Sequence, residues 1–537
     1  MTQKLRFDVP RKGIAILLGL ASALGPIITP GFAAEAKKPA QTVKAPGLQP
    51  TTPIQHLVVI FQENVSFDHY FGTYPFARNP KGESKFIGAA NTPAVNGYTS
   101  ALLTNNPNLN PANGAAASNP FRLAPSQVVT SDQDHGYTDE QAAYDMGLAD
   151  LFPLHTGFGS NETMAYFDGN TVTALWNYAQ FFAMSDNSYG TTFGPSTPGL
   201  LNLVAGQTNG VVNIINGLGD EVSGGPDGSY TMIGDADPLN DVCSNPTRNQ
   251  GQMSGPNIGN LLSASGITWG GFMGGFNLQT INPNGTTGCA RSSTGLPGTT
   301  NDYIAHHSFF GYHPSTANPT HARPASIAEI GSAGPANHQY DLADFFTAVS
   351  AGNFPAVSFL KASAYQDGHA GYSDPLDEQT FLVNTINFLE ATPYWNNTAV
   401  VILYDDSDGW YDHVMPPIMN ASTGPADALT GPGACGTAAT SLPGVNVMGN
   451  PHALGRCGYG MRQPLLVISP WARQNFVDHS VTDQTSIIHF IEDNWLGGQR
   501  LGSGSFDGIA NSITQMFNFK NVRTNGTLIL NPTTGKK

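Results

Sequence analysis

The stretch that most constrains the fold is residues 399–413, which read AVVILYDDSDGWYDH. Six apolar or aromatic residues run without a break into a group of acids. An unbroken run of this kind, rich in Val and Ile, is typical of a strand buried on both faces of a parallel sheet. The acids that follow, beginning with Asp405 and Asp406, are then expected at the carboxyl edge of that sheet, where α/β proteins bind their ligands.

Asp405 and Asp406 are adjacent carboxylates, and they allow two interpretations. Two carboxylates that are buried together repel each other unless a cation lies between them, so the pair predicts a metal site. An acidic, solvated loop after a core strand would have a similar sequence. This stretch taken alone does not choose between the two.

Three further apolar runs predict strands of the same sheet. They are HLVVIF at residues 56–61, AVSFL at residues 356–360 and PLLVISP at residues 464–470. Residues 376–389 lie between two of these strands and have the apolar spacing of a helix. Strands that alternate with helices predict an α/β fold with a mostly parallel central sheet flanked by helices.

Polar side chains follow these strands at the point where each strand ends. Glu63 and Asn64 come directly after the first run, and His369 follows the second after a short loop. Because the carboxyl ends of parallel strands meet at one edge of a sheet, these side chains are expected in the same cleft as Asp405 and Asp406. Taken alone, Glu63 and Asn64 could equally cap their strand.

Composition shifts along the chain predict its domain organisation. Residues 1–34 combine a basic start, an apolar segment and small residues, which predicts an export signal peptide, with an uncleaved membrane anchor as the alternative. The remaining boundaries are an N-terminal tail at 35–53, an α/β core at 54–208 and 336–520, loop-rich insertions at 209–335 and 424–457 that form a smaller cap, and a C-terminal tail at 521–537.

Charge and cysteine content narrow the partners and the compartment. The formal net charge of -16 argues against nucleic acid and anionic membranes as electrostatic partners, and no later segment predicts a stable membrane span. An even number of cysteines in an exported chain predicts disulfides, whereas zinc ligands would need a C-x-x-C pair that is absent from the sequence. The expected pairs are Cys243 with Cys289 and Cys435 with Cys457, each within one insertion.

Residues 194–198 (GPSTP) place two hydroxyls at the start of a predicted helix. Free backbone N–H groups at a helix N-terminus attract phosphate. Ser or Thr followed by Pro is also an ordinary way to begin a helix. On these local grounds Ser196 and Thr197 compete for the role of nucleophile.

Histidines are the second group of candidates, at positions His135, His306, His307 and His369. A phosphate dianion beside carboxylates needs positive donors. Lys and Arg are scarce outside segments that look like surface tails, so histidine is the expected cation. Protonated histidine binds phosphate best below about pH 6.5, which predicts an acid optimum. Each histidine could also be an ordinary loop residue.

Taken together, these residues resemble the bacterial phosphoesterase family that includes phosphatidylcholine-type phospholipases C and acid phosphatases of the burst-inhibiting type. The resemblance spans residues 56–495 and implies an alkaline-phosphatase-like fold. The strings that carry it are ENVSFDHYFG (63–72), FGPSTPG (193–199), HH (306–307), YQDGHAGYSDP (365–375), YDDSDGWYDH (404–413) and LVISPWARQNFVDHS (466–480).

The resemblance implies a role for each candidate. Ser196 matches the nucleophile, and His307 or His369 is the expected general acid. One divalent ion is implied; oxygen ligands suit Ca²⁺, Mg²⁺ or Mn²⁺, and an added histidine would admit Zn²⁺ or Fe. The implied metal ligands are Glu63, Asn64, Asp405 and Asp406, and the implied phosphate contacts are Asn64, His135, His306, His307 and His369.

Two departures from the family's phospholipase branch bear on the substrate. That branch often has Pro-Asn-Arg after the nucleophile and Asp-Glu-His-Gly-Gly at the second acidic motif, whereas this chain has PGL at 198–200 and DDSDG at 405–409. The expected function is therefore a periplasmic or secreted, metal-dependent acid phosphatase that hydrolyses small phosphomonoesters through a phosphoserine. A phospholipase C that cleaves phosphatidylcholine-type phosphodiesters is the alternative, and a non-catalytic exported binding protein is a remote one.

Overall fold

The fold is described from a computed structural model that covers residues 49–225, 228, 230–436 and 454–537. The predicted signal peptide, most of the N-terminal tail and residues 437–453 of the second insertion lie outside the described residues. Within the described ranges, none of the helices has the length and apolar character that a bilayer crossing requires.

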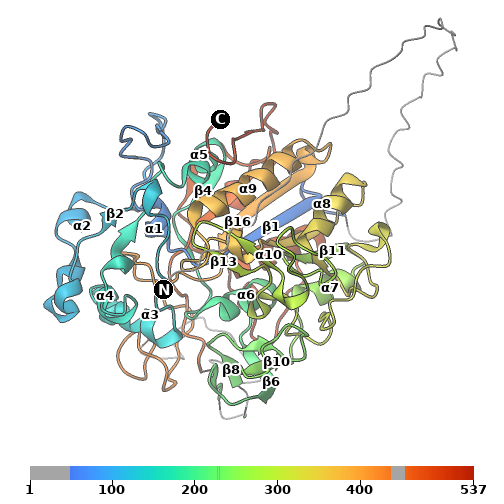
Figure 1. The fold of residues 1–537 in the computed structure, drawn as a ribbon, viewed down its shortest axis with the longest axis horizontal. Helices are drawn as coiled ribbons and strands as arrows, with labels where there is room; N and C mark the ends of the chain where they lie inside the picture. Colours follow the sequence, from blue (N-terminus) through green and yellow to red (C-terminus); the bar gives the residue numbers. More distant parts are fainter. Residues whose placement is uncertain (1–48, 226–227, 229, 437–453) are drawn as a thin grey trace, which may run out of the picture. The chain divides into compact units, whose positions relative to one another are not determined.

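An eight-stranded sheet forms the centre of the fold (Figure 1). The strand β17 is antiparallel to both of its neighbours, and the other pairings are parallel. The predicted α/β fold with a mostly parallel sheet is confirmed. In spatial order the strands are β14 (Gln339–Asp341), β11 (Trp269–Met273), β15 (Val357–Lys361), β1 (His56–Gln62), β16 (Thr398–Tyr404), β17 (Leu465–Ile468), β4 (Ala183–Ser185) and β18 (Phe476–Asp478).

The register of the three middle strands brings their carboxyl ends together. β1 lies between β15 and β16, and Leu57 is level with Val357 on one side and with Ala399 on the other. All of β16 is buried, as expected for an apolar strand covered on both faces. Because Gln62 is level with Tyr404, the residues that follow β1 and β16 leave the sheet side by side.

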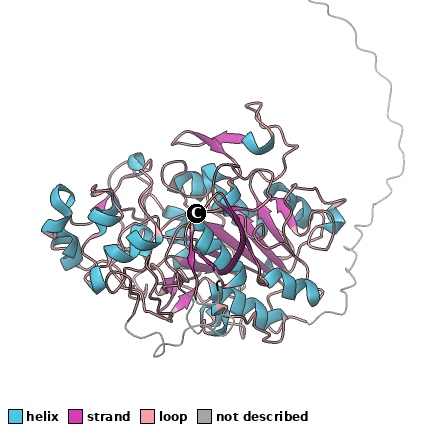
Figure 2. Cartoon of the chain, turned by 90° about the horizontal axis from the view of Figure 1, so that it is seen from below, coloured by secondary structure: helices cyan, strands magenta, loops and turns pink. Residues whose placement is uncertain are grey.

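Helices lie on both sides of this sheet (Figures 1 and 2). One packed pair is α5 (Thr173–Phe181) with α9 (Pro375–Glu390), and another is α6 (Ser196–Ala205) with α10 (Thr485–Trp495). The helix predicted at 376–389 is α9, which begins after Asp374, whose side chain accepts hydrogen bonds from the backbone N–H of Leu376 and Asp377. Two further helices, α7 (Ile258–Ala264) and α8 (Leu342–Ser350), contact the strand β11.

One glycine lets α6 approach the sheet. A Cβ atom on Gly199 would lie 2.3 Å from the backbone oxygen of Asp405, so a larger residue could not fit without moving the backbone. This contact brings the first turn of α6 against the end of β16.

The expected insertion at 209–335 is more mixed than its composition indicates. Its first part forms a separate five-stranded sheet, visible below α6 in Figure 1, but β11 in the same range is a strand of the central sheet. The composition therefore marks a loop-rich range that is interrupted by one core strand. The small sheet consists of β7 (Glu221–Ser223), β8 (Tyr230–Met232), β6 (Asn209–Ile215), β10 (Gln250–Met253) and β9 (Asp237–Pro238).

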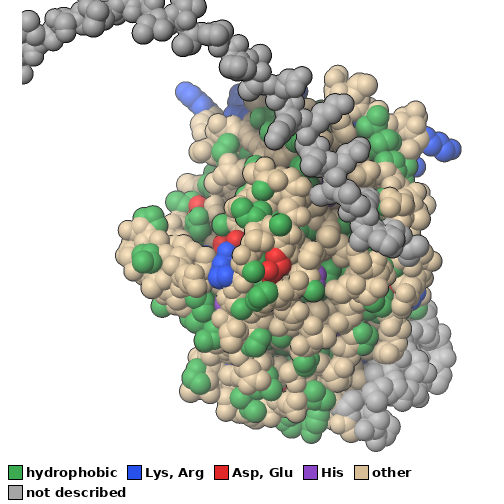
Figure 3. Space-filling view, turned by 90° about the vertical axis from the view of Figure 1, so that its right-hand side faces the viewer, with side chains coloured by type: hydrophobic (Ala, Val, Ile, Leu, Met, Phe, Trp, Pro, Cys, Tyr) green, Lys and Arg blue, Asp and Glu red, His purple; other side chains and the backbone are tan. Residues whose placement is uncertain are grey.

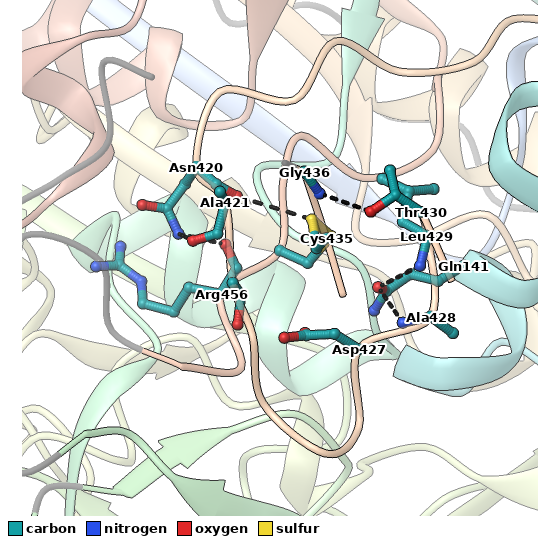
Figure 4. The surroundings of a disulfide bond; sticks show 12 residues. Gln141, Asn420, Ala421, Asp427, Ala428, Leu429, Thr430, Cys435, Gly436 and Arg456 are labelled. Carbon is teal, nitrogen blue, oxygen red and sulfur yellow. Dashed lines mark hydrogen bonds between the residues drawn. A yellow bond between two sulfur atoms is a disulfide. The ribbon is translucent and has the colours of Figure 1, made fainter. Parts of the chain in front are cut away.

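Both predicted disulfides are confirmed: Cys243 pairs with Cys289, and Cys435 with Cys457. Figure 4 shows the second pair inside its loop. In the same loop, the side-chain oxygen of Gln141 accepts hydrogen bonds from two backbone N–H groups, those of residues 428 and 429. Gln141 belongs to α3 (Tyr137–Ala143), so this second insertion is tied to the segment that carries His135.

Residues 528–535 are packed against two helices that lie much earlier in the sequence. Asn387 of α9 donates a 2.7 Å hydrogen bond to the backbone oxygen of Leu530. Asn177 of α5 donates an equally short one to the backbone oxygen of Gly535. Glu390, the last residue of α9, accepts the backbone N–H of Leu528. The segment therefore links α5 to α9.

Candidate active site

The four predicted metal ligands converge at the carboxyl ends of β1 and β16. Glu63, Asn64, Asp405 and Asp406 are all at most 3% exposed. One carboxylate oxygen of Asp405 accepts the backbone N–H of Asn64 at 3.1 Å and that of Asp406 at 2.9 Å. Asn64 has a φ of 56°, in the left-handed region that Asn tolerates better than most residues. The convergence expected from the strand ends is present.

Ser196 faces these carboxylates from the first turn of α6. Its hydroxyl lies 3.0 Å from Glu63 Oε2 and 3.2 Å from Asp406 Oδ2, so it donates to one of them at a time. The Thr197 hydroxyl instead contacts the hydroxyl of Tyr312 at 3.2 Å. Of the two hydroxyls that competed on sequence grounds, the structure places Ser196 against the carboxylates.

Three of the four predicted histidines border the cluster. His307 Nδ1 lies 3.1 Å from Glu63 Oε1. His135 Nε2 lies 3.4 Å from the side-chain nitrogen of Asn64, and the ring of His369 packs edge-on against the ring of His135. The three histidines thus come from separate segments of the chain and lie next to Glu63, next to Asn64 or next to one another.

His306 has different neighbours, although it is adjacent to His307. Its Nδ1 lies 3.2 Å from Arg248 Nη1 and 3.6 Å from Asp237 Oδ1. Both partners come from the loop-rich range before β11. The structure therefore places His306 next to the site but does not bring it against the predicted metal ligands.

A lysine that is not among the candidate residues lies against the carboxylates, so histidine is not the only cation near them. That the histidines contact the phosphate stays a prediction. Lys361, the last residue of β15, is buried, bonds to Glu63 Oε1 and lies 3.2 Å from Asp405 Oδ2. The sequence did contain a signal for it. The apolar run at 356–360 ends in this lysine, at the same kind of position as Glu63 and Asp405.

Arg248 is the second cation that the sequence did not reveal. Its guanidinium donates a 2.5 Å hydrogen bond to the backbone oxygen of Asp235. The side chain of Asp235 in turn accepts the backbone N–H of Thr197 at the start of α6. Arg248 lies in an irregular, Gly- and Asn-rich range, where periodicity carries no information about which residues reach the site.

Burial, mutual repulsion and the charge of Lys361 together shift the pKa values of the acids in different directions. Burial raises the pKa of Glu63 well above its usual range, and the charge of Asp405 adds to this shift. Burial also raises the pKa of Asp406. For Asp405, burial opposes ionisation, but the nearby Lys361 outweighs it and lowers the pKa. The cluster therefore holds its negative charge most firmly on Asp405.

The surroundings of the three histidines next to the cluster also shift their pKa values in different directions. Burial lowers the pKa of His369 to about 4. Burial, together with the neighbouring His306 and Lys361, lowers that of His307 well below 6.5. Burial alone would also lower the pKa of His135, but the charges of Asp406 and Asp408 outweigh it and raise the pKa. His135 is therefore the histidine in this set that favours the charged form.

The residues present fit a divalent cation. The side-chain oxygen of Asn64 is buried and has no hydrogen-bond partner among the described residues, and one carboxylate oxygen of Asp408 is in the same state. A buried polar atom without a partner is costly unless something else binds it. Carboxylate and amide oxygens are ligands for Ca²⁺, Mg²⁺ and Mn²⁺, while the adjacent His307 also admits Zn²⁺ or Fe.

A second group of acids lies only a few residues further along the same two motifs. Asp68 and Asp412 both contact Arg462, whose Nη2 lies 3.0 Å from a carboxylate oxygen of each. His413 Nδ1 lies 2.5 Å from the other oxygen of Asp68. The guanidinium of Arg462 also lies over the ring of Phe67. This group is held together by the chain's own arginine, which links the segment of Asp68 to that of Asp412.

The surface near His135 carries exposed apolar side chains. Met146, Leu148, Leu154 and Phe158 are 45–71% exposed and lie around α4 (Phe152–His155). This segment is joined to the loop of His135 by a 2.8 Å hydrogen bond from the backbone of residue 134 to that of residue 156. Figure 3 draws a different face of the molecule, seen from the right-hand side of Figure 1, and charged side chains are few there too.

Comparison with known proteins places this geometry in a family. A model of the Phosphoesterase family matches residues 54–496. The chain is 25% identical over 452 residues to a protein named Non-hemolytic phospholipase C from Burkholderia pseudomallei, covering 82% of this chain and 55% of that protein. It is 24% identical to Phospholipase C B from Mycobacterium tuberculosis, covering 82% of this chain and 73% of that protein. The chain thus spans little more than half the length of the Burkholderia relative.

Among solved structures, the chain is similar to a protein in the alkaline phosphatase superfamily from Vibrio parahaemolyticus. The two share 11% sequence identity at a TM-score of 0.27, covering 84% of this chain and 69% of that chain. A murine ectonucleotide pyrophosphatase / phosphodiesterase 5 is similar at 13% identity and a TM-score of 0.28, covering 65% of this chain and 95% of that chain.

Proposed function

We propose that this chain, which belongs to the phosphoesterase family, is a metal-dependent phosphoric ester hydrolase that acts on phosphomonoesters through a phosphoserine. The observation that carries the proposal is the position of Ser196. Its hydroxyl lies at a helix N-terminus and within 3.2 Å of two buried carboxylates, Glu63 and Asp406. A hydroxyl beside a base and a cation site has the surroundings that activate a nucleophile.

The proposed reaction begins at the serine oxygen. A divalent cation held by Glu63, Asn64, Asp405 and Asp406 would supply Lewis acidity, lowering the pKa of the hydroxyl and neutralising phosphoryl charge. Ser196 Oγ gives its proton to a neighbouring carboxylate and attacks phosphorus, while the bond from phosphorus to the leaving oxygen breaks in line. Water then hydrolyses the phosphoserine and releases inorganic phosphate.

His307 and His369 are the candidates for protonating the leaving oxygen. Both are buried, and burial lowers the pKa of each, to about 4 for His369. Their protonated forms therefore increase as the pH falls below neutrality. This direction supports an acid optimum, and a cation bound beside Glu63 and Asp406 would keep these carboxylates ionised against the raised pKa values that burial gives them.

Two features support phosphomonoesters as the substrate class. The chain lacks the Pro-Asn-Arg and Asp-Glu-His-Gly-Gly strings that the resemblance associates with phospholipases. In addition, Arg248 reaches the start of α6 through Asp235 and so adds a second fixed cation near Ser196. A monoester dianion carries one more negative charge than a diester and gains more from such a cation.

A phospholipase C is the second candidate function. It is favoured by the names of the relatives and by the exposed apolar side chains around α4, close to His135. Exposed apolar groups beside an active site suit a lipid surface. The same serine and carboxylates would then cleave a phosphatidylcholine-type phosphodiester.

Parallel turnover measurements separate the two candidates. We expect p-nitrophenyl phosphate to be hydrolysed with a larger kcat/KM than phosphatidylcholine in mixed micelles, and Ser196→Ala to abolish both activities. Faster turnover of phosphatidylcholine would replace the first candidate with the second. If Ser196→Ala kept more than a few per cent of wild-type turnover, the nucleophile assignment would be wrong.

We further propose that the protein is exported to the periplasm or secreted. The two disulfides support this location, because such bonds persist in oxidising compartments. Cell fractionation with an antibody against the chain tests it, and a fully reduced protein in the cytosol would contradict it.

A further inference from the structure

Lys361 is the only buried lysine among the described residues, and its charge lies inside the group of acids. It ends β15, the direct neighbour of β1, so it emerges at the same edge of the sheet as Glu63. Its Nζ contacts Glu63 Oε1 and Asp405 Oδ2 and lies 5.5 Å from the centre of the Phe61 ring. Lysine is rarely buried unless its charge is paired, and here two carboxylates pair it.

The carboxylates of the site present their oxygens in two directions. Glu63 Oε1 and Asp405 Oδ2 meet the ammonium group of Lys361. The second oxygen of Glu63 meets the hydroxyl of Ser196 instead, together with one oxygen of Asp406. The side-chain oxygen of Asn64, which has no hydrogen-bond partner within the described ranges, is a further acceptor in this cluster. The cluster thus has two cation positions, and the chain's own ammonium fills one of them.

We propose that Lys361 is a positioning residue that permanently fills the first cation position and thereby limits the cluster to one divalent ion, next to Ser196. The inference rests on the metal site of the proposed function. A divalent ion that bridged Glu63 and Asp405 on the lysine side would lie within a few ångströms of the ammonium, and the two like charges would repel strongly in a buried site.

The same arrangement gives Lys361 a second effect. By holding one oxygen of Glu63, the ammonium orients the other oxygen toward the serine hydroxyl. It also holds one oxygen of Asp405, whose other oxygen accepts two backbone N–H groups. Glu63 and Asp405 are therefore held in place before any ion binds. Without Lys361, these acids would attract a second ion, and the ammonium of Lys361 takes the place of that ion.

The test is the number of ions that the full chain binds. Wild type, Lys361→Ala, Lys361→Arg and the surface control Lys520→Ala are stripped with EDTA and titrated with Mn²⁺ alone by calorimetry. Bound manganese is then measured by elemental analysis after gel filtration. Lys520 is exposed, so its variant loses the same charge away from the site. Glu63→Gln identifies which ions bind at the cluster.

We expect one Mn²⁺ per chain for wild type, Lys361→Arg and Lys520→Ala, and two for Lys361→Ala. In the double variant Lys361→Ala/Glu63→Gln, the added ion should be lost again. One ion in Lys361→Ala would overturn the inference, as would two cluster ions in wild type. No ion in wild type but one in Lys361→Ala would overturn the proposed metal site while supporting the lysine's place in a cation position. No ion in either would overturn both.

Lys361→Ala removes the lysine that pairs with two buried acids and could fail to fold without an ion. It is therefore also purified in Mn²⁺ and compared by thermal unfolding with and without EDTA. We expect Mn²⁺ to raise the Tm of Lys361→Ala by more than it raises that of wild type. An equal rise in both proteins would count against the inference.

Discussion

Two clusters of acids and histidines lie within a few residues of each other on the same two sequence motifs, yet they are built differently. In one, which we call the open cluster, Glu63, Asp406 and Ser196 meet next to an Asn64 oxygen that has no hydrogen-bond partner in the part of the chain that the structure describes. In the other, which we call the closed cluster, the four members Asp68, Asp412, His413 and Arg462 contact one another through charged groups. The two clusters contain similar types of residue. They differ in whether the chain supplies enough positive charge to pair with all of the carboxylates.

The closed cluster has an arginine whose fork reaches two carboxylates at once, and this arginine is fully buried with both of them. Bidentate pairing of this kind gives well-defined geometry and leaves no oxygen for an external ligand. The open cluster has one lysine for several carboxylates and therefore keeps part of its negative charge available. The comparison shows that a site for a ligand is recognised by what remains unsatisfied, more than by which residues are present.

The largest expected effect is on catalysis at the open cluster. Ser196→Ala removes the nucleophile, so we expect kcat with p-nitrophenyl phosphate to fall on the order of 10⁴-fold or more, with little change in stability. Thr197→Ser is the control, because it keeps a hydroxyl that faces Tyr312 rather than the carboxylates. A comparable loss in Thr197→Ser would mean that the wrong hydroxyl has been assigned.

The next effect is on stability at the closed cluster. Arg462→Met leaves Asp68 and Asp412 buried without their partner, and we expect a loss of about 3–5 kcal/mol in the free energy of unfolding. Urea denaturation measures it. Arg323→Met, which breaks the less buried pair with Asp344, is expected to cost only about 0–1 kcal/mol. Equal losses would mean that the closed cluster does not brace the fold.

Removal of metal is expected to affect the open cluster alone. An ion present at about 100 times its Kd stabilises the folded state by about 2.7 kcal/mol, so EDTA should lower the Tm of wild type. In Asp406→Asn, which removes one ligand charge, the shift should be smaller. Arg462→Met should show the same EDTA shift as wild type, and a reduced shift there would indicate that the two clusters are coupled.

The smallest expected effect is the pH dependence of the stability that the closed cluster contributes. Burial opposes the charging of His413, but Asp68 outweighs it and raises the pKa of His413, while His413 and Arg462 lower the pKa of Asp68 against the effect of burial. The histidine's contribution is therefore complete below its unfolded pKa of about 6.5 and is lost as the pH rises through its raised folded pKa. The contribution of Asp68 is present above about pH 3.9 and is lost as the pH falls through its lowered folded value.

We therefore expect His413→Asn to destabilise by about 1–2 kcal/mol between about pH 4 and 6.5, with the difference from wild type shrinking at higher pH. Urea unfolding at several pH values measures this. A difference that grows with rising pH would contradict the assigned direction.

Much of the open cluster could be predicted because its residues follow buried strands. The apolar run before Asp405 and the run before Glu63 indicate a shared sheet edge, and parallel pairing of β1 with β16 brings those two acids together. The helix start at Ser196 could be anticipated from Pro198 and the neighbouring hydroxyls. Periodicity and strand ends are local signals, and they predict the elements on which these residues lie.

The remainder depends on contacts between distant segments. Arg462 lies before β17, about 400 residues from Asp68, and nothing local indicates that they meet. Arg248 reaches the site from an irregular loop, and β11 is a short core strand within a range whose composition is that of a loop. Such features depend on tertiary packing, which residue spacing alone does not encode.

The hydrogen bonds from α5 and α9 to residues 528–535 have a consequence for how the protein acquires its structure. Contacts across such separations form late, since closing a long loop costs entropy before the contact compensates for it. During synthesis, both helices therefore lack these contacts until residues 528–535 have been made. Nascent chains halted before residue 528 should remain accessible to protease around α9, and chains in which residues 528–535 have left the ribosome should be protected there.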